Sequence, residues 1–256
     1  MLANEPDFLH YLKTSGMTLT GKYDIPTVKG IKLKHLENAD LIGFNYATNP
    51  KNAEFNDDRF VHFFLSDNQI ERLWDNLEYY EPVFRLWKGI IQPDFSQYTT
   101  MPRAMCIWQH YRRMWVTQYY QNRGLHVIPA PCWSDEESFE YCFDGMPKGS
   151  CLCVSSVGCM MNAQVRALFN QGLQETLNRL EPSQLIIYGK IDNDLKNHIS
   201  GIPYKHIVHE MKERIQFSRL KERKNLKWVD VDRVEEPRVA ELVEELNPTV
   251  VDFKAQ

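Results

Sequence analysis

Short apolar runs alternate with longer amphipathic stretches along most of this 256-residue chain. Buried strands of a parallel sheet have such continuous apolar sequences, so each run predicts a strand. The predicted strands are residues 41–47, 60–65, 88–92, 125–129, 150–156, 184–188 and 204–209.

Apolar residues recur at helical spacing between these runs. Ile70, Leu73, Trp74 and Leu77 predict a helix that Ser66 caps, with Gln69 completing a capping box. A long helix is predicted from Pro102 to Asn122, because Pro favours helix starts and Gly124 favours an end. A shorter one is predicted after Trp133 and Ser134, with Glu137 in the capping-box position, and a strongly amphipathic one over residues 162–180.

Strands that alternate with helices indicate βαβ units, so we predict an α/β fold with a largely parallel sheet of about six βα units. Either a doubly wound sheet or an incomplete barrel fits this alternation. The chain is long enough for an eight-stranded barrel, but eight strands are not found. The predicted organisation is an N-terminal extension (1–40) that packs on the body, an α/β core domain (41–209) and a charged helical tail (210–256).

Composition and charge narrow the class of protein. Hydrophobic residues make up 43% and charged residues 25%, with a formal net charge of -4, which excludes a disordered chain and a uniformly basic nucleic-acid coat protein. No apolar run reaches the roughly 20 residues that span a bilayer, so no membrane association is predicted. Asn4, Glu5 and Asp7 stand where a signal peptide needs basic residues, so we expect a cytoplasmic protein.

The tail conceals a charge asymmetry. Residues 205–227 hold eight bases against three acids, and residues 228–256 hold eight acids against three bases. Within the basic part, Arg219, Lys221, Arg223 and Lys224 are candidates for contacts with nucleic-acid phosphates. The alternatives are a solvated helix, pairing with the acidic part, or a homo-oligomer formed through the tail.

Several motif-like patterns carry no predicted chemistry. Gly16 to Lys22 has the spacing of a phosphate-binding loop, but Tyr23 replaces the magnesium-binding hydroxyl. His209 and Glu210 begin a zinc-helix pattern that lacks its second histidine. The six cysteines include no C-x-x-C pair, and we interpret them as reduced thiols that fill the core. No metal site is predicted, and no cofactor is identified.

Polar and aromatic residues follow four of the predicted strands, at the sheet edge where parallel α/β folds bind ligands. Asp94, Asp135 and Lys190 are the candidate catalytic groups, two acids or bases and one anion-holding cation. The candidate ligand-binding residues are Ser96, Trp133, Ser155, Ser156 and Tyr188. The alternative is ordinary loop polarity, and Asp135 is also explained as a helix cap.

The helix over residues 102–122 combines Arg112 and Arg113 with several aromatic residues. Such a mixture is typical of single-stranded nucleic-acid binding. It is equally typical of a helix packed on a sheet, with arginines that extend to the surface.

Residues 89–190 resemble a domain-of-unknown-function family of phages, plasmids and conjugative elements. The resemblance lies in Pro93-Asp94-Phe95-Ser96, Trp133-Ser134-Asp135, the Phe143 to Ser150 block and the Val154 to Gly158 block. It implies a mobile-element origin and hence the cytoplasm of the host. It implies no activity.

Three functional hypotheses follow. The first is an enzyme that acts on a nucleotide, a nucleic acid or another phosphate-bearing ligand at the strand ends. The second is a non-catalytic anti-defence or regulatory factor that binds a host or phage protein. The third is a DNA-binding accessory in replication or transfer.

Overall fold

A computed structural model describes residues 7–49, 52 and 59–209 of the chain. Seven parallel strands form its centre, pairing in the order β3-β4-β5-β6 and β7-β8-β9. The two sheets meet where the Cys153 N–H donates to the Pro129 carbonyl, 2.9 Å away. The strands are β3 (Asp40–Gly43), β4 (Arg59–His62), β5 (Gly89–Ile91), β6 (Val127–Ile128), β7 (Cys151–Ser155), β8 (Gln184–Tyr188) and β9 (Tyr204–Ile207).

The seven strands curve around one apolar interior. Each strand contributes to a single buried cluster that includes Leu41, Phe60, Ile91, Ile128, Cys153, Ile186 and Ile207. A doubly wound fold requires the strand order to reverse at one point in the sheet. Here neighbouring strands follow one another in sequence order, with no such reversal among the described strands. The fold is therefore α/β, and of the two predicted architectures it is the incomplete barrel. The 3₁₀ helix η2 (Leu36–Asn38) lies beside β9 and leads into β3.

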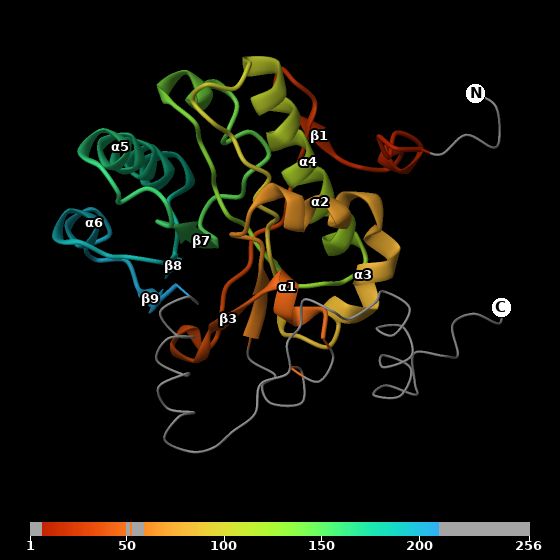
Figure 1. Ribbon diagram of the computed structural model, residues 1–256, viewed down its shortest axis with the longest axis horizontal. Coiled ribbons are helices and arrows are strands. Elements are labelled where there is room, and N and C mark those ends of the chain that lie inside the picture. Colours follow the sequence, from red (N-terminus) through yellow and green to blue (C-terminus); the bar gives the residue numbers. More distant parts are fainter. Residues whose placement is uncertain (1–6, 50–51, 53–58, 210–256) are drawn as a thin grey trace.

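Helices cover the outer face of this wall (Figure 1). Side chains alternate along a strand, so the residues between the interior ones face outward. Those of β3 to β6 pack with α2 (Asp67–Asp75), α3 (Leu77–Phe84) and α4 (Arg103–Asn122). Those of β7 and β8 pack with α5 (Ala163–Leu180) and α6 (Asn193–His198).

Three local predictions were wrong in detail. The strand predicted at 41–47 ends at Gly43 and continues as the helix α1 (Phe44–Ala47). The helix after Ser66 begins as predicted, but the Ser66 side chain makes no capping hydrogen bond, and Asn76 separates α2 from α3. The helix after Trp133 is the 3₁₀ helix η4 (Glu136–Glu140), capped by Asp135 and Ser138 rather than through Glu137.

The N-terminal segment contacts the barrel over most of its length. After η1 (Leu12–Thr14), β1 (Leu19–Thr20) and β2 (Ile25–Pro26) form an antiparallel hairpin. Gly145 has a φ of +74°, and a Cβ there would lie 2.3 Å from the Pro26 carbonyl oxygen, so only glycine allows this approach. The Ile31 carbonyl then accepts from the Cys151 N–H, and Leu33 pairs with the Gln184 amide. Residues 31–33 therefore lie across the N-terminal ends of β7 and β8.

No helix in the described part of the chain is long and apolar enough to cross a membrane.

Candidate functional site

The carboxyl ends of the seven strands lie at one end of the barrel, which we call the mouth. Asp94 stands three residues after β5 and forms an ion pair with Arg113 of α4, with Oδ1 and Nη1 3.2 Å apart. The Arg113 side chain is 1% exposed and the Asp94 side chain 28%. Arg113 also donates from Nη2 to the Ala130 carbonyl at 2.5 Å, so it ties the loop after β5 to the loop after β6.

The charge state of Asp94 follows from its surroundings. Burial raises the pKa of Asp94, the negative charge of Asp67 raises it further, and Arg113 opposes both, so that the net pKa is raised. Cys132, after β6, is close enough to hydrogen bond with this pair. Burial raises the pKa of Cys132 to about 12, so it is a neutral thiol at neutral pH. Asp94 is therefore the group at the mouth whose surroundings favour proton uptake.

Ser96 is fixed by the same loop system. Its backbone N–H donates to Oδ1 of Asp67 at 3.1 Å, which joins the loop after β5 to the start of α2. The Ser96 side chain is half-buried.

Tyr188, the last residue of β8, belongs to a group of aromatic rings that spans the mouth. Its ring centroid lies 4.5 Å from that of His62 at the end of β4 and 5.4 Å from that of Phe64. The centroid of the His209 ring, after β9, lies 5.6 Å from that of Tyr188. His62 is also among the groups that act electrostatically on the Asp94 carboxyl group.

Ser155 is the last residue of β7, and Ser156 and Lys190 lie on the loops that follow β7 and β8. The Ser155 hydroxyl accepts from the Val157 N–H at 3.3 Å, and the buried Ser156 hydroxyl donates to the Lys190 carbonyl at 2.7 Å. The Lys190 side chain is exposed. No hydrogen bond or ion pair between described residues joins Lys190 to Asp94, so their joint action stays a prediction.

Asp135 and Trp133 have structural roles in the same connection. Asp135 accepts from the Ser138 N–H at 2.9 Å and pairs with Arg103 at 3.0 Å. Burial acts to raise the pKa of Asp135, but these hydrogen bonds outweigh it and the net pKa is lowered. The Trp133 ring packs on Gly172 and on Phe169, whose centroid is 5.7 Å away.

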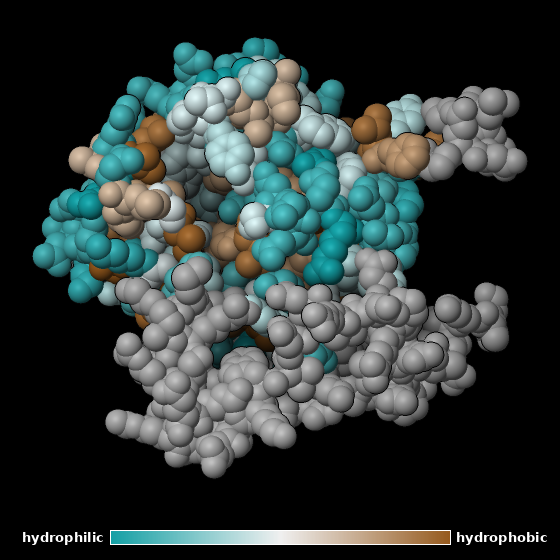
Figure 2. All heavy atoms as spheres, viewed as in Figure 1, coloured by the Kyte–Doolittle hydropathy of each residue, from teal (hydrophilic) through white to brown (hydrophobic). Residues whose placement is uncertain are grey.

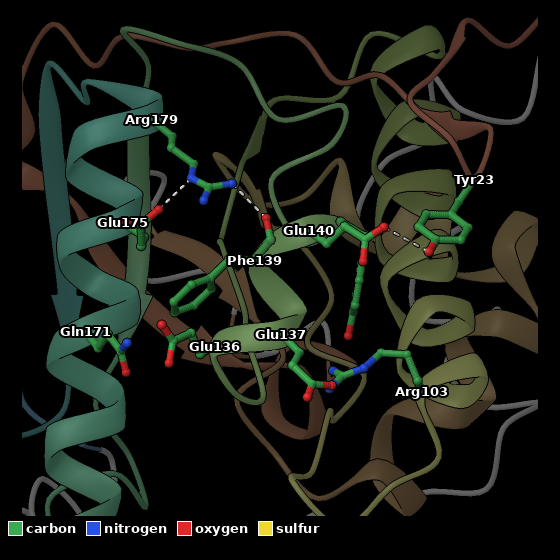
Figure 3. Close-up of a pocket in the computed structure, with 10 residues that line it drawn as sticks. Tyr23, Arg103, Glu136, Glu137, Phe139, Glu140, Gln171, Glu175 and Arg179 are labelled. Atoms are coloured by element: carbon green, nitrogen blue, oxygen red, sulfur yellow. Dashed lines mark hydrogen bonds and ion pairs between the residues drawn. The ribbon is translucent and has the colours of Figure 1, made fainter.

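A groove that the sequence reasoning missed lies outside the barrel wall, between η4 and α5 (Figure 3). Its volume is about 650 Å³. Its charged groups largely neutralise one another, through Arg103 with Glu137, Arg179 with Glu175, and Glu140 with Lys22. The acidic run at 135–140 was the only signal in the sequence. The lining residues are Tyr23, Arg103, Glu136, Glu137, Phe139, Glu140, Tyr141, Gln171, Glu175 and Arg179.

Arg112 and Arg113 of α4 are not at the surface. Arg112 is 6% exposed, pairs with Glu71, and stands 4.0 Å over the Phe95 ring. Together with the burial of Arg113, this assigns both guanidinium groups to packing within the protein rather than to a nucleic-acid surface.

An apolar surface lies at the start of the described chain. Figure 2 shows apolar side chains gathered on this segment, where Phe8, Leu9, Tyr11 and Leu12 are all more than half exposed. His10 anchors it between Trp74 and Trp115. Exposed apolar patches of this kind are typical of interaction surfaces, but a host-protein partner stays a prediction.

Arg219, Lys221, Arg223 and Lys224 lie outside the described residues. Within residues 7–49, 52 and 59–209, no group of three or more His, Cys, Asp or Glu residues could hold a metal ion.

Comparison with known proteins assigns the chain to a family. Residues 17–206 match the family described as Domain of unknown function (DUF4417). The chain belongs to this family. The resemblance predicted for residues 89–190 is confirmed, and the DUF4417 match extends it to the N-terminal hairpin and to β9.

Phage proteins are among the relatives of this DUF4417 chain. It is 39% identical over 131 residues to the "Gene 1 protein" of Mycobacterium phage D29, and 37% identical over 131 residues to that of Mycobacterium phage L5. These matches cover 51% of this chain, 48% of the D29 protein and 57% of the L5 protein. The chain thus spans about half the length of the curated relatives it matches. No solved structure matches it.

Proposed function

We propose that this DUF4417 protein is an enzyme that acts on a phosphate-bearing ligand at the barrel mouth. The observation that carries the proposal is the Asp94 carboxyl group, held at the end of β5 by a fully buried arginine. Barrel enzymes place their catalytic groups at the carboxyl ends of the strands. The pKa of Asp94 is raised above its ordinary value by burial, which is the direction that a general acid or base needs.

In this proposal the residues at the mouth have distinct roles. Asp94 transfers the proton, and Arg113 positions it. Lys190 holds the anionic group of the ligand from the loop after β8. Arg166, in the first turn of α5, lies 3.7 Å from Asp192 two residues beyond Lys190, which brings a second cation to the same rim. Asp135 is the weaker candidate for acid or base because its hydrogen bonds to Arg103 and Ser138 lower its pKa, whereas the pKa of Asp94 is raised.

The test is a turnover assay on the full chain with nucleotides, sugar phosphates, and single- and double-stranded DNA. We expect at least one of these to be converted, and Asp94→Asn to lower the rate by at least about 100-fold. Asp75→Asn, an exposed aspartate at the end of α2, is the matched control and keeps the wild-type rate. Absence of turnover across the panel, or equal rates for Asp94→Asn and wild type, overturns the proposal.

A further inference from the structure

The aromatic group at the mouth comes from opposite sides of the barrel. His62 ends β4 and Phe64 follows it, whereas Tyr188 ends β8 and His209 follows β9. Phe64 and Tyr188 are nearly parallel, with 20° between their planes, and His62 and Phe64 are parallel to within 24°. The three rings therefore form a stack in which Phe64 lies over His62 and Tyr188, whose centroids are 4.5 Å apart.

The exposure of these rings is graded. His62 is 0% and Tyr188 1% exposed, so they form a floor that belongs to the core. Phe64 and His209 are half-buried and form the outer layer. A planar aromatic group that ends a stack of this kind offers its face to another planar ring.

Charged groups stand beside this stack. Lys190 comes two residues after Tyr188 along the chain, and Arg166 reaches the same rim through Asp192. Asp94 is close enough to His62 for their charges to interact. The mouth therefore combines a surface for a flat ring, cations for a phosphate and a carboxyl group.

We propose that the ligand of the mouth is a mononucleotide, whose base stacks on Phe64 and whose phosphate faces Lys190 and Arg166. This rests on the proposed function and narrows its ligand class. Base stacking is sequence-tolerant because each nucleobase has an aromatic face. The stack thus selects a nucleotide over a sugar phosphate without choosing between bases.

The experiment compares binding of adenosine 5′-monophosphate, guanosine 5′-monophosphate and ribose 5-phosphate to the full chain by calorimetry. Phe64→Leu removes the ring and keeps an apolar side chain. We expect it to weaken the binding of both nucleotides by at least about fivefold and to leave the binding of ribose 5-phosphate unchanged. Phe143 is a half-buried phenylalanine of the β6–β7 connection, so Phe143→Leu is the matched control. It leaves the binding of the nucleotides and of ribose 5-phosphate unchanged.

A second variant covers the case in which Phe64→Leu does not fold. In Phe64→Trp the nucleotide base stacks on the new ring, so its fluorescence falls when either nucleotide is added. The wild-type titration corrects for the chain's six tryptophans. Ribose 5-phosphate leaves the fluorescence unchanged.

The outcomes separate the two proposals. Equal binding of nucleotides and ribose 5-phosphate, with no effect of Phe64→Leu, overturns the nucleotide proposal and leaves a phosphate-bearing ligand in place. Equal weakening of all three ligands by Phe64→Leu also overturns it, because the ring then acts only on the fold. Turnover of a sugar phosphate that depends on Asp94, without nucleotide binding, supports the proposed function alone.

Discussion

At the residue scale, Arg113 is the side chain on which the mouth depends. Its guanidinium is 1% exposed and balances Asp94. Removing one partner of a buried ion pair leaves the other charge uncompensated, which costs about 3–5 kcal/mol. We expect Arg113→Met to lower the free energy of unfolding in urea by about this amount.

The double variant Arg113→Met/Asp94→Asn tests the cause. It removes both charges, so we expect it to recover part of the stability that Arg113→Met loses. Arg85→Met is the control, because Arg85 pairs with Glu81 at the surface and is 44% exposed, where such pairs contribute about 0–1 kcal/mol. Additive losses in the double variant would show that Arg113 and Asp94 are not coupled.

Asp135 gives a stability prediction that depends on pH. The pKa of Asp135 is lower in the folded chain than in the unfolded chain. Its contribution to folding stability is therefore present above the ordinary aspartate pKa of about 4 and is lost as the pH falls below that value. We expect Asp135→Ala to cost about 1–2 kcal/mol at pH 7, and the difference from wild type to narrow towards pH 3. Urea titrations at both pH values measure this.

Glu137→Ala is the matched control for Asp135→Ala. Glu137 contacts the same Arg103 but is 85% exposed and caps no helix. We expect it to change stability by less than about 0.5 kcal/mol at either pH. A pH-independent loss in Asp135→Ala would assign the whole effect to the cap rather than to the ionised carboxylate.

At the element scale, α5 is positioned by a glycine where helix propensity alone favours alanine. A Cβ on Gly172 would lie 2.2 Å from the Trp133 ring. Overpacking typically costs about 1–3 kcal/mol, more than the roughly 1 kcal/mol that alanine gains in a helix. We expect Gly172→Ala to lower the melting temperature and Gln171→Ala, on the exposed face, to leave it unchanged or raise it.

The strands and long helices could be predicted because their signals are local. Residues 185–188 are buried on both faces and are apolar or aromatic throughout, and α5 begins after Asn162 and ends at Leu180 as its periodicity predicts. The break at Asn76 could not be predicted, because Leu77 continues the apolar stripe of α2. The choice between a doubly wound sheet and a barrel was equally hidden, since both need the same alternation of elements.

The candidate site was only partly predictable for the same reason. Asp94, Ser155 and Tyr188 could be found because they end or follow strands. Arg113 lies in the middle of a helix, and only tertiary packing brings it to Asp94. His62 and Phe64 read as ordinary strand residues, although their rings meet Tyr188 across the barrel.

At the scale of the whole molecule, the N-terminal segment is part of the barrel's packing. Ile25 and Val28 are buried, and residues 31–33 pair with β7 and β8. Burial of each apolar side chain of this size contributes about 1.5–3 kcal/mol to the free energy of unfolding. We expect removal of residues 1–40 to abolish cooperative unfolding in urea, and removal of residues 1–16 to preserve it. Equal stability of the two shortened chains would contradict this.

The contact between Ile31 and Ser150, 119 residues apart, also has a consequence for synthesis. Ribosomes add roughly 5–20 residues per second. The segment with Ile31 and Leu33 therefore leaves the ribosome on the order of 10 seconds before its partner strands exist. During translation in the cell, its apolar side chains have no native surface to cover them, which makes this early segment a natural binding site for a chaperone.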